Sequence, residues 1–310
     1  MDVARQFAST RSHADLLRFA LGMHIDGAPE IAQNAVVNVL DCESFEHDHG
    51  LLTEVGLVSF ERCEMVEAFK DPGPHGENIL KRMYFYHLRL ISNAHFVNRQ
   101  WCPGDPEKNH FGNTRFLTHS EVKSALNEAF AWPLDPNDPS KGNCPVFFMG
   151  HAVSNDLRML QDSVGFDAAA LGTVVATLDT QQIARDVGIR GRGHQIGLQT
   201  LAGFFGVQYR DPHTACNDAA YTIIAAVQMV LNNIPPSDKS LQSVVEDLEV
   251  SSQAELTTWG ISKYCTCCGQ AGHLRFRCAL KDRLFCNRCA AAGRENAAHS
   301  HIDEMCSRIH

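Results

Sequence analysis

Residues 36–45 read VVNVLDCESF, an apolar run that ends in two carboxylates. The β-branched residues at its start favour an extended strand. Side chains alternate between the two faces of a strand, so Asp41 and Glu43 project from the same face. Two carboxylates next to a hydrophobic run repel each other unless a cation lies between them. We therefore expect a strand that carries a metal-binding or catalytic pair at its end.

The rest of the chain indicates an α/β fold built around this strand. Further strands are expected at 54–60, 83–91, 146–149 and 174–178, and helices at 12–23, 120–130, 156–162, 180–187, 197–205, 214–232 and 240–249. Short connections join the first three strands, which favours an antiparallel meander. After a loop at about 102–112, strands alternate with helices, which favours parallel pairing. A meander followed by βαβ units is typical of a ribonuclease-H-like mixed sheet flanked by helices.

The 310 residues are enough for one large core and a smaller unit. We expect an N-terminal helical extension at 1–30, a main domain at 31–234, a linker at 235–258 and a small domain at 259–310. Within the linker, apolar residues at helical spacing predict an amphipathic helix, which either packs on the main domain or binds a partner.

Charge is unevenly distributed along the chain. The formal net charge is −9, yet residues 259–310 carry eight Lys or Arg against four Asp or Glu, a net charge of +4. The remaining residues therefore carry −13, which excludes a broadly basic nucleic-acid-binding protein and suggests a division of roles between body and tail. No run of 18 apolar residues occurs, so no membrane span and no membrane partner are expected.

Cysteine usage points to metal binding rather than disulfides. Seven of the twelve cysteines lie between Cys265 and Cys306, and the N-terminus lacks the pattern of a secretory signal. Clustered cysteines in such a chain are typical of zinc sites in a reducing compartment. We expect an intracellular protein, in the cytoplasm or the nucleus.

Three more residues complete a candidate catalytic site. Asp156 follows the strand 146–149, at the sheet edge where α/β proteins usually build sites. Taken singly, Asp156 is equally well explained as a helix cap, although Asn155 could provide that cap instead. His213 comes just before a predicted helix and is as readily a surface residue, and Asp218 lies in the first turns of that helix. Together with Asp41 and Glu43, these residues make four carboxylates and one histidine. Such a set suits a site that holds two divalent cations and activates a water.

These residues resemble the three motifs of the DEDDh 3′→5′ exonucleases, a branch of the ribonuclease-H-like superfamily. The positions that match D-x-E, the second-motif Asp and H-x4-D are Asp41, Glu43, Asp156, His213 and Asp218. Flanking stretches that are similar to the same family are LLTEVGLVSF (51–60), TLDTQQIAR (177–185) and GLQTLAGFFGV (197–207), and residues 87–117 contain a stretch similar to an insert of a fungal subgroup. The resemblance covers about 36–232. It implies that the four carboxylates hold two Mg²⁺ or Mn²⁺ ions and that His213 is the general base.

The tail carries two sets of zinc-ligand residues. The first set has the C-x2-C-x4-H-x4-C spacing of the CCHC zinc knuckle, which it resembles: Cys265, Cys268, His273 and Cys278. The second set is Cys286, Cys289, either His299 or His301, and Cys306. Tandem sites and a cross-brace similar to a B-box use nearly the same ligands, and both arrangements predict two structural zinc ions. Cys267 is expected to be a non-ligand.

The composition of the tail favours nucleic acid over protein as its partner. Aromatic residues alternate with Lys and Arg there, which suits stacking and backbone contacts with a single strand. B-box-like units more often bind protein, so a protein partner stays open. The leading hypothesis is a metal-dependent 3′→5′ exonuclease acting on single-stranded nucleic acid, RNA more than DNA, with a tail that captures substrate. The alternative is an adaptor protein with a vestigial site.

Overall fold

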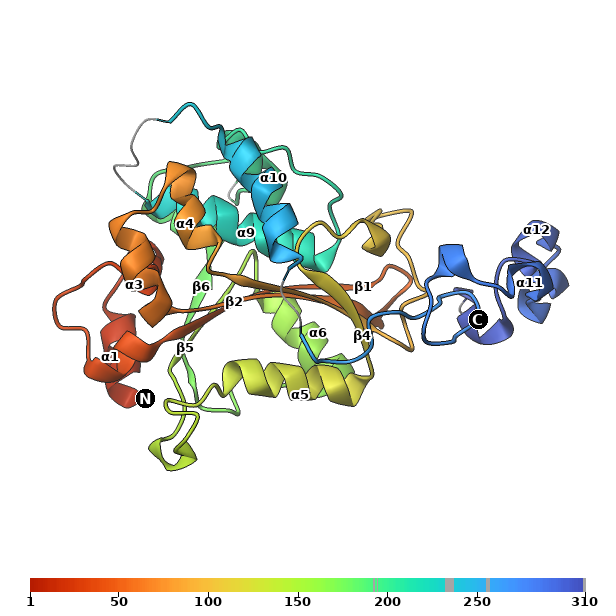
Figure 1. Cartoon of the computed structure of the whole chain (residues 1–310), viewed down its shortest axis with the longest axis horizontal. Coiled ribbons are helices and arrows are strands. Elements are labelled where there is room, and N and C mark those ends of the chain that lie inside the picture. Colours follow the sequence, from red (N-terminus) through yellow and green to blue (C-terminus); the bar gives the residue numbers. More distant parts are fainter. Residues whose placement is uncertain (192, 194, 232–236, 255–256, 309–310) are drawn as a thin grey trace.

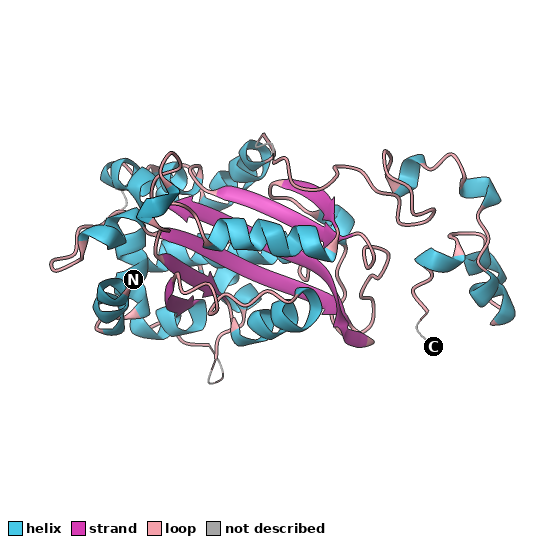
Figure 2. Ribbon diagram, turned by 90° about the horizontal axis from the view of Figure 1, so that it is seen from below, coloured by secondary structure: helices cyan, strands magenta, loops and turns pink. Residues whose placement is uncertain are grey.

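A six-stranded mixed sheet forms the centre of the protein (Figure 2). The computed structural model describes residues 1–191, 193, 195–231, 237–254 and 257–308. The strands are β1 (Val36–Phe45), β2 (Asp48–Glu61), β3 (Tyr84–Leu90), β4 (Asn113–Leu117), β5 (Val146–Gly150) and β6 (Val174–Asp179). They lie in the order β4-β3-β2-β1-β5-β6. β1, β2 and β3 form an antiparallel meander, and β5 and β6 run parallel to β1, as predicted. The predicted fold class is confirmed.

Helices cover both faces of the sheet (Figure 1). They are α1 (Asp2–Ser9), α2 (His13–Ala20), α3 (Arg62–Lys70), α4 (Glu77–Leu80), α5 (His119–Phe130), α6 (Ser154–Val164), α7 (Thr180–Asp186), α8 (Leu198–Phe204), α9 (Ala215–Val230), α10 (Leu241–Ser252), α11 (Asn287–Ala291) and α12 (Glu295–Ala298). Val39 packs in the core that contains α9, whereas Leu40 packs in the core that contains α5 and α6. Because side chains alternate along β1, Asp41 and Glu43 point to the same face as Val39. The strand pair therefore faces α9.

The helices that precede and follow the main domain pack on its core. Ser12 accepts a hydrogen bond from the Asp15 backbone N–H, which caps α2, and Leu17 is fully buried. In α10, Val244 and Val245 are fully buried in the same core. The expected amphipathic helix thus packs on the body. The predicted boundary at 234–235 lies outside the described residues. No helix in the described part of the chain is long and apolar enough to cross a bilayer.

β4 is the strand that sequence patterning missed. It lies inside the segment expected to be an insert and pairs in parallel with β3, with Arg89 opposite Phe116. The Arg89 side chain is buried there: it lies over the Phe116 ring at 5.0 Å, donates to the Ala94 carbonyl at 2.6 Å and pairs with Glu107 at 2.6 Å. Five residues with several polar positions gave no strand signal, because the pairing depends on this long-range packing.

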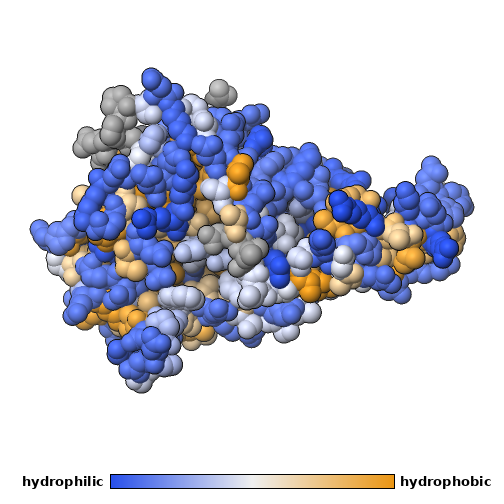
Figure 3. Space-filling view, viewed as in Figure 1, coloured by the Kyte–Doolittle hydropathy of each residue, from blue (hydrophilic) through white to orange (hydrophobic). Residues whose placement is uncertain are grey.

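The cysteine-rich tail is docked against β4. Phe116 and Ile261 form an antiparallel bridge, and Arg115 donates to the carbonyls of Trp259 and Gly260 at 2.6 and 2.7 Å. Tyr264 packs with Phe116 in a small apolar cluster. The tail projects from this end of the molecule (Figure 1), and its surface mixes hydrophobic with strongly hydrophilic residues (Figure 3).

Gly56 on β2 sets how closely α9 approaches the sheet. A Cβ atom at position 56 would lie 2.1 Å from the Ala215 carbonyl oxygen, which is far inside van der Waals contact. Ala215 is the first residue of α9 and follows His213 by two positions. The glycine therefore allows the helix start, with its catalytic candidates, to lie directly on the sheet.

We expect Gly56→Ala to lower the free energy of unfolding by about 3 kcal/mol, because the helix must move away from the sheet. Urea denaturation measures this. Gly203→Ala is the control, because Gly203 is an exposed helical glycine and an added methyl group there would have nothing within 4 Å. It should be neutral or stabilising by up to ~1 kcal/mol. Equal effects of the two substitutions would contradict the packing role of Gly56.

Candidate active site and zinc-binding tail

Asp41 lies in the second half of β1, and one of its carboxylate oxygens, Oδ2, is buried without a hydrogen-bond partner in the described structure. Burial raises the pKa of this carboxyl, and the negative charges of Asp218, Asp156 and other carboxylates raise it further. Burial also raises the pKa of Glu43, although the hydrogen bond with His213 opposes this. A buried, unpaired oxygen among like charges is an acceptor that fits a cation.

Asp156 reaches the same sheet end from α6. Its Oδ1 atom accepts a hydrogen bond from the Cys42 backbone N–H at 2.9 Å, which fixes the carboxylate beside the strand pair. Burial raises the pKa of Asp156 to about 7, opposed by backbone hydrogen bonds including that one. Asp156 lies in the first turn of α6, which begins at Ser154 without a side-chain cap. The alternative of a capping role for Asp156 or Asn155 is therefore wrong.

His213 and Asp218 close the site from α9 and the loop before it. The His213 backbone lies in the left-handed region, with φ 58°, and its N–H donates to Asp218 Oδ2 at 3.0 Å. This turns the half-exposed imidazole toward Glu43, with 3.5 Å between Nδ1 and Oε1. The hydrogen bond to Glu43 raises the pKa of His213. Burial raises the pKa of Asp218 to about 7, although the Tyr209 hydroxyl opposes this.

The structure thus brings all five predicted residues to one end of the sheet. Glu43, His213 and Asp218 have ligand atoms within 4.8 Å of one another, in an arrangement that could hold a metal ion. Asp41 and Asp156 lie outside that tight group but within its electrostatic reach. The donors are mostly carboxylate oxygens, which are the ligands that Mg²⁺ and Mn²⁺ prefer.

Two further residues support the site and were missed as site residues from sequence. The Tyr209 hydroxyl donates to Asp218 Oδ1 at 2.6 Å. The buried Glu54 accepts from the Ala215 backbone N–H at 3.3 Å and pairs with His87 at 2.8 Å, which ties the start of α9 to β2 and β3. A carboxylate inside the apolar run 51–60 was the available signal for Glu54. Tyr209 lies in a loop and gave none.

The tail contains two compact groups of zinc-ligand type. Their ligand atoms lie within 4.8 Å of one another in each group, and the groups are Cys265, Cys268, His273 and Cys278, then Cys286, Cys289, His301 and Cys306. Three thiolates and an imidazole are a typical tetrahedral zinc set. The cysteines are also the centres of two very small apolar clusters, too small to order the tail alone. The donor sets therefore fit one zinc ion each.

This grouping resolves the alternatives left by the sequence. The ligands are sequential, as in tandem sites, and not interleaved, as in a cross-brace. His301 belongs to the second group, whereas the His299 ring packs edge-on against Phe285 at 5.3 Å. Cys267 lies outside both groups, although its sulfur is 3.2 Å from that of Cys265.

Residues 36–229 match the DEDDh_C family, described as DNA polymerase III subunit epsilon-like, C-terminal domain. The chain belongs to this family. The predicted membership of the DEDDh exonucleases, which are hydrolases that use divalent metals, is therefore confirmed for the main domain. The match includes all five candidate residues, and the zinc-ligand tail lies beyond it.

Other similar proteins cover part of this DEDDh chain. A Saccharomyces cerevisiae protein named Good for full DBP5 activity protein 2 is 24% identical over 209 residues, which cover 62% of the chain. The chain spans about a third (35%) of that yeast protein. Two exonuclease I structures each cover 64% of the chain, and the chain covers 40% of each of them: a zinc-bound E. coli ExoI–ssDNA complex (14% identity, TM-score 0.36) and an exonuclease I structure described as suggesting how processivity is achieved (13%, 0.35).

The buried carboxylates should make stability fall as pH rises when Mg²⁺ and Mn²⁺ are withheld. With a pKa of about 7 instead of about 4, Asp156 keeps a proton in the folded protein that the unfolded chain releases. The free energy of unfolding that this proton contributes is therefore lost between about pH 4 and pH 7. Asp156→Asn keeps the acceptor for Cys42 and removes this titration. The variant should gain stability relative to wild type with rising pH, by at most about 1.4 kcal/mol per unit.

Urea unfolding at pH 5, 6, 7 and 8 measures this difference. The comparison between the two proteins matters because other groups titrate in the same range. Burial lowers the pKa of His95 to about 4, for example, which gives a pH dependence of opposite sign in both proteins. A difference that is constant with pH would contradict the raised pKa of Asp156.

Zinc content provides a separate test of the tail. We expect two zinc ions per wild-type chain and one in Cys268→Ser, because a hydroxyl is a poor zinc ligand. Cys267→Ser is the matched control and should keep both ions. Elemental analysis of the purified proteins measures this, and loss of an ion from Cys267→Ser would contradict the ligand grouping.

Proposed function

We propose that this chain is a 3′→5′ exonuclease that hydrolyses single-stranded nucleic acid, RNA in preference to DNA, by a two-metal mechanism. The convergence of three carboxylates around a buried oxygen of a fourth, Asp41, carries the proposal, since that oxygen has no partner among the described residues. The four that would hold the two ions are Asp41, Glu43, Asp156 and Asp218. A plain structural role explains this cluster poorly, because repulsion and burial both oppose it.

The chain's own residues have distinct tasks in this reaction. When bound, the two cations supply an activated water and stabilise the leaving oxygen. His213 is the proton acceptor: Glu43 raises its basicity, and its half-exposed ring can meet water that enters with the substrate. The Tyr209 hydroxyl holds Asp218 in a fixed orientation, and a backbone N–H of β1 does the same for Asp156. These carboxylates therefore need not reorganise when cations bind.

The zinc-binding tail supports the choice of substrate. Zinc knuckles are among the modules that recognise single-stranded RNA, and the tail carries exposed Phe276 and Phe285 among arginines. Its net charge of +4 beside an acidic body favours contact with phosphates. We propose that the tail captures the strand and the main domain cleaves it. Recruitment of a protein partner by the tail is the alternative.

Glu43→Gln and Asp218→Asn should each abolish release of mononucleotides in Mg²⁺ or Mn²⁺, because each removes a metal ligand. His213→Ala should slow release by about 10²- to 10⁴-fold and spare strand binding, because it removes only the proton acceptor. Labelled RNA and DNA oligonucleotides with a free or blocked 3′ end measure both the rate and the direction. Faster release from RNA with a free 3′ end is the expected preference.

Glu246→Gln is the control, because Glu246 is an exposed carboxylate on α10 away from the site. It should match wild type. Magnesium should be omitted rather than chelated in blank reactions, since a chelator also extracts zinc from the tail. Nucleotide release by Glu43→Gln at the wild-type rate would overturn the proposed function, and failure of the wild type on all substrates would favour an adaptor with a vestigial site.

A further inference from the structure

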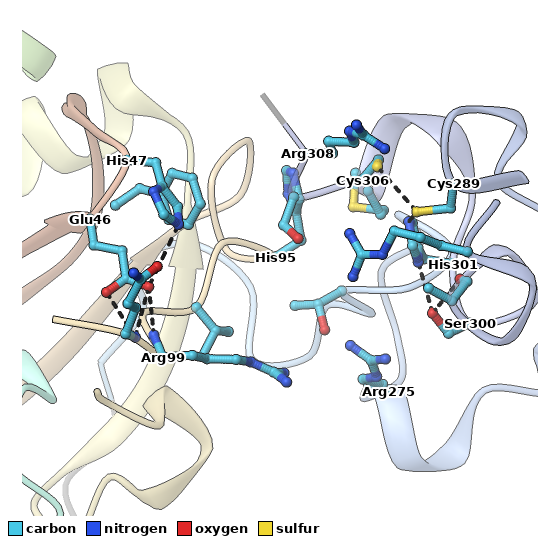
Figure 4. Close-up of a pocket in the computed structure, with 18 residues that line it drawn as sticks. Glu46, His47, His95, Arg99, Arg275, Cys289, Ser300, His301, Cys306 and Arg308 are labelled. Atoms are coloured by element: carbon cyan, nitrogen blue, oxygen red, sulfur yellow. Dashed lines mark hydrogen bonds and ion pairs between the residues drawn. The ribbon is translucent and has the colours of Figure 1, made fainter. Parts of the chain in front are cut away.

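A cleft of about 800 Å³ separates the main domain from the zinc-binding tail. Its main-domain wall comes from the end of β1 and from residues 95–100, and its tail wall includes the second zinc-ligand group. Figure 4 shows Arg99 extending from the main domain toward the tail, with Arg275 and His301 on the opposite side and Arg308 above them.

Four arginines line this cleft: Arg99, Arg275, Arg294 and Arg308. In the described structure none of them forms an ion pair, whereas the arginines that do so lie elsewhere. Glu46 is the one carboxylate among the described lining residues, and its oxygens accept from the backbone N–H groups of residues 99–101 at 2.8 to 3.0 Å. That carboxylate therefore positions the loop that carries Arg99 and leaves the guanidinium groups available to an external anion.

A second cavity, of about 550 Å³, continues the cleft toward the catalytic residues. It shares Arg99 and Arg275 with the first cavity and extends to Asp211 and Pro212, which directly precede His213. Three acidic side chains line it. Glu107 pairs with Arg89 at 2.6 Å, and Asp211 pairs with Lys108 at 3.1 Å and His110 at 2.8 Å. Asp105 accepts a hydrogen bond from the Glu107 backbone N–H at 3.2 Å and, in the described structure, pairs with neither shared arginine. The path from tail to active site therefore keeps the positive charge of its two shared arginines.

An exposed aromatic side chain lies beside this path. Trp101 follows the Arg99 loop and is 63% exposed, and its ring meets His47 edge-on at 5.2 Å. His47 in turn packs against Phe45, two residues after Glu43. Exposed indole rings next to a basic groove are typical platforms on which unpaired bases stack.

We propose that this cleft is the binding channel for the single strand on the 5′ side of the scissile bond. The phosphates of the strand contact the four arginines of the cleft, and a base stacks on Trp101. This inference rests on the proposed function, which it deepens by giving the strand a route. Three ligands of the second zinc group also line the tail wall, so that zinc site holds Arg294 and Arg308 in position.

The charge and shape of the cleft favour nucleic acid over a protein partner. Guanidinium groups on both walls suit a chain of repeated phosphates, and each contact contributes to affinity by releasing counterions. A strand held by both walls must also be flexible and narrow, which a duplex is not. The channel should therefore prefer single strands over duplexes, for RNA and DNA alike.

The test measures binding without turnover. In a Glu43→Gln background without added magnesium, Arg99→Ala/Arg275→Ala should bind a labelled 20-nucleotide single strand about 10- to 100-fold more weakly. The slope of log affinity against log salt should fall by about 1.4, since each lost phosphate contact removes about 0.7. Fluorescence anisotropy with RNA, DNA and duplex 20-mers measures both quantities, and a duplex should bind more weakly than either single strand.

Arg82→Ala/Lys123→Ala is the matched control, because it removes the same charge from exposed main-domain positions that do not line either cavity. It should keep the affinity and the salt slope of the parent. Equal losses in the two double variants would overturn the channel in favour of a diffuse charge effect, and unchanged affinity in Arg99→Ala/Arg275→Ala would overturn it in favour of an acidic protein partner. Because no turnover is needed, absent hydrolysis would overturn the proposed function and leave this result standing.

Discussion

Repulsion among carboxylates gathered at the end of β1 is the constraint on which the site depends. Asp41 is surrounded by other acidic groups and has one buried oxygen without a partner in the described structure. Such a cluster survives folding only if neighbours fix each group and bound protons or cations offset the charge. Backbone and hydroxyl donors hold Asp156 and Asp218, and Gly56 lets α9 come close enough to contribute its residues. The carboxylates that the proposed chemistry needs are therefore the same groups whose repulsion destabilises the fold.

Local patterns predicted the central fold, and the order of three motifs that resemble the DEDDh exonucleases singled out the five candidate residues. The alternation of β1 placed Asp41 and Glu43 on one face, and the helix start at residue 215 placed His213 and Asp218 together. Features that depend on distant packing could not be predicted. β4, for example, depends on the packing of residues 89 and 116, which lie far apart in the sequence.

The uneven charge of the chain has a structural counterpart. Acidic groups gather at the catalytic end of the sheet, and arginines without ion pairs in the described structure line the cleft that separates this domain from the tail. The Glu46 carboxylate lies in this cleft but does not neutralise the Arg99 guanidinium group. Its oxygens instead accept hydrogen bonds from backbone N–H groups. A single strand would thus move from positive charge toward a site whose own negative charge needs cations.

The contact between the tail and β4 also covers one edge of the sheet. β4 is the outer strand of the sheet, and the segment entering the tail pairs with it at Phe116 and Ile261, while Arg115 occupies the neighbouring carbonyls. An open outer strand is a template for pairing with another chain. Removing residues 259–310 would uncover this edge, so a shortened protein would tend to self-associate through its sheet. The tail is in this sense an edge cover as well as a metal-binding unit.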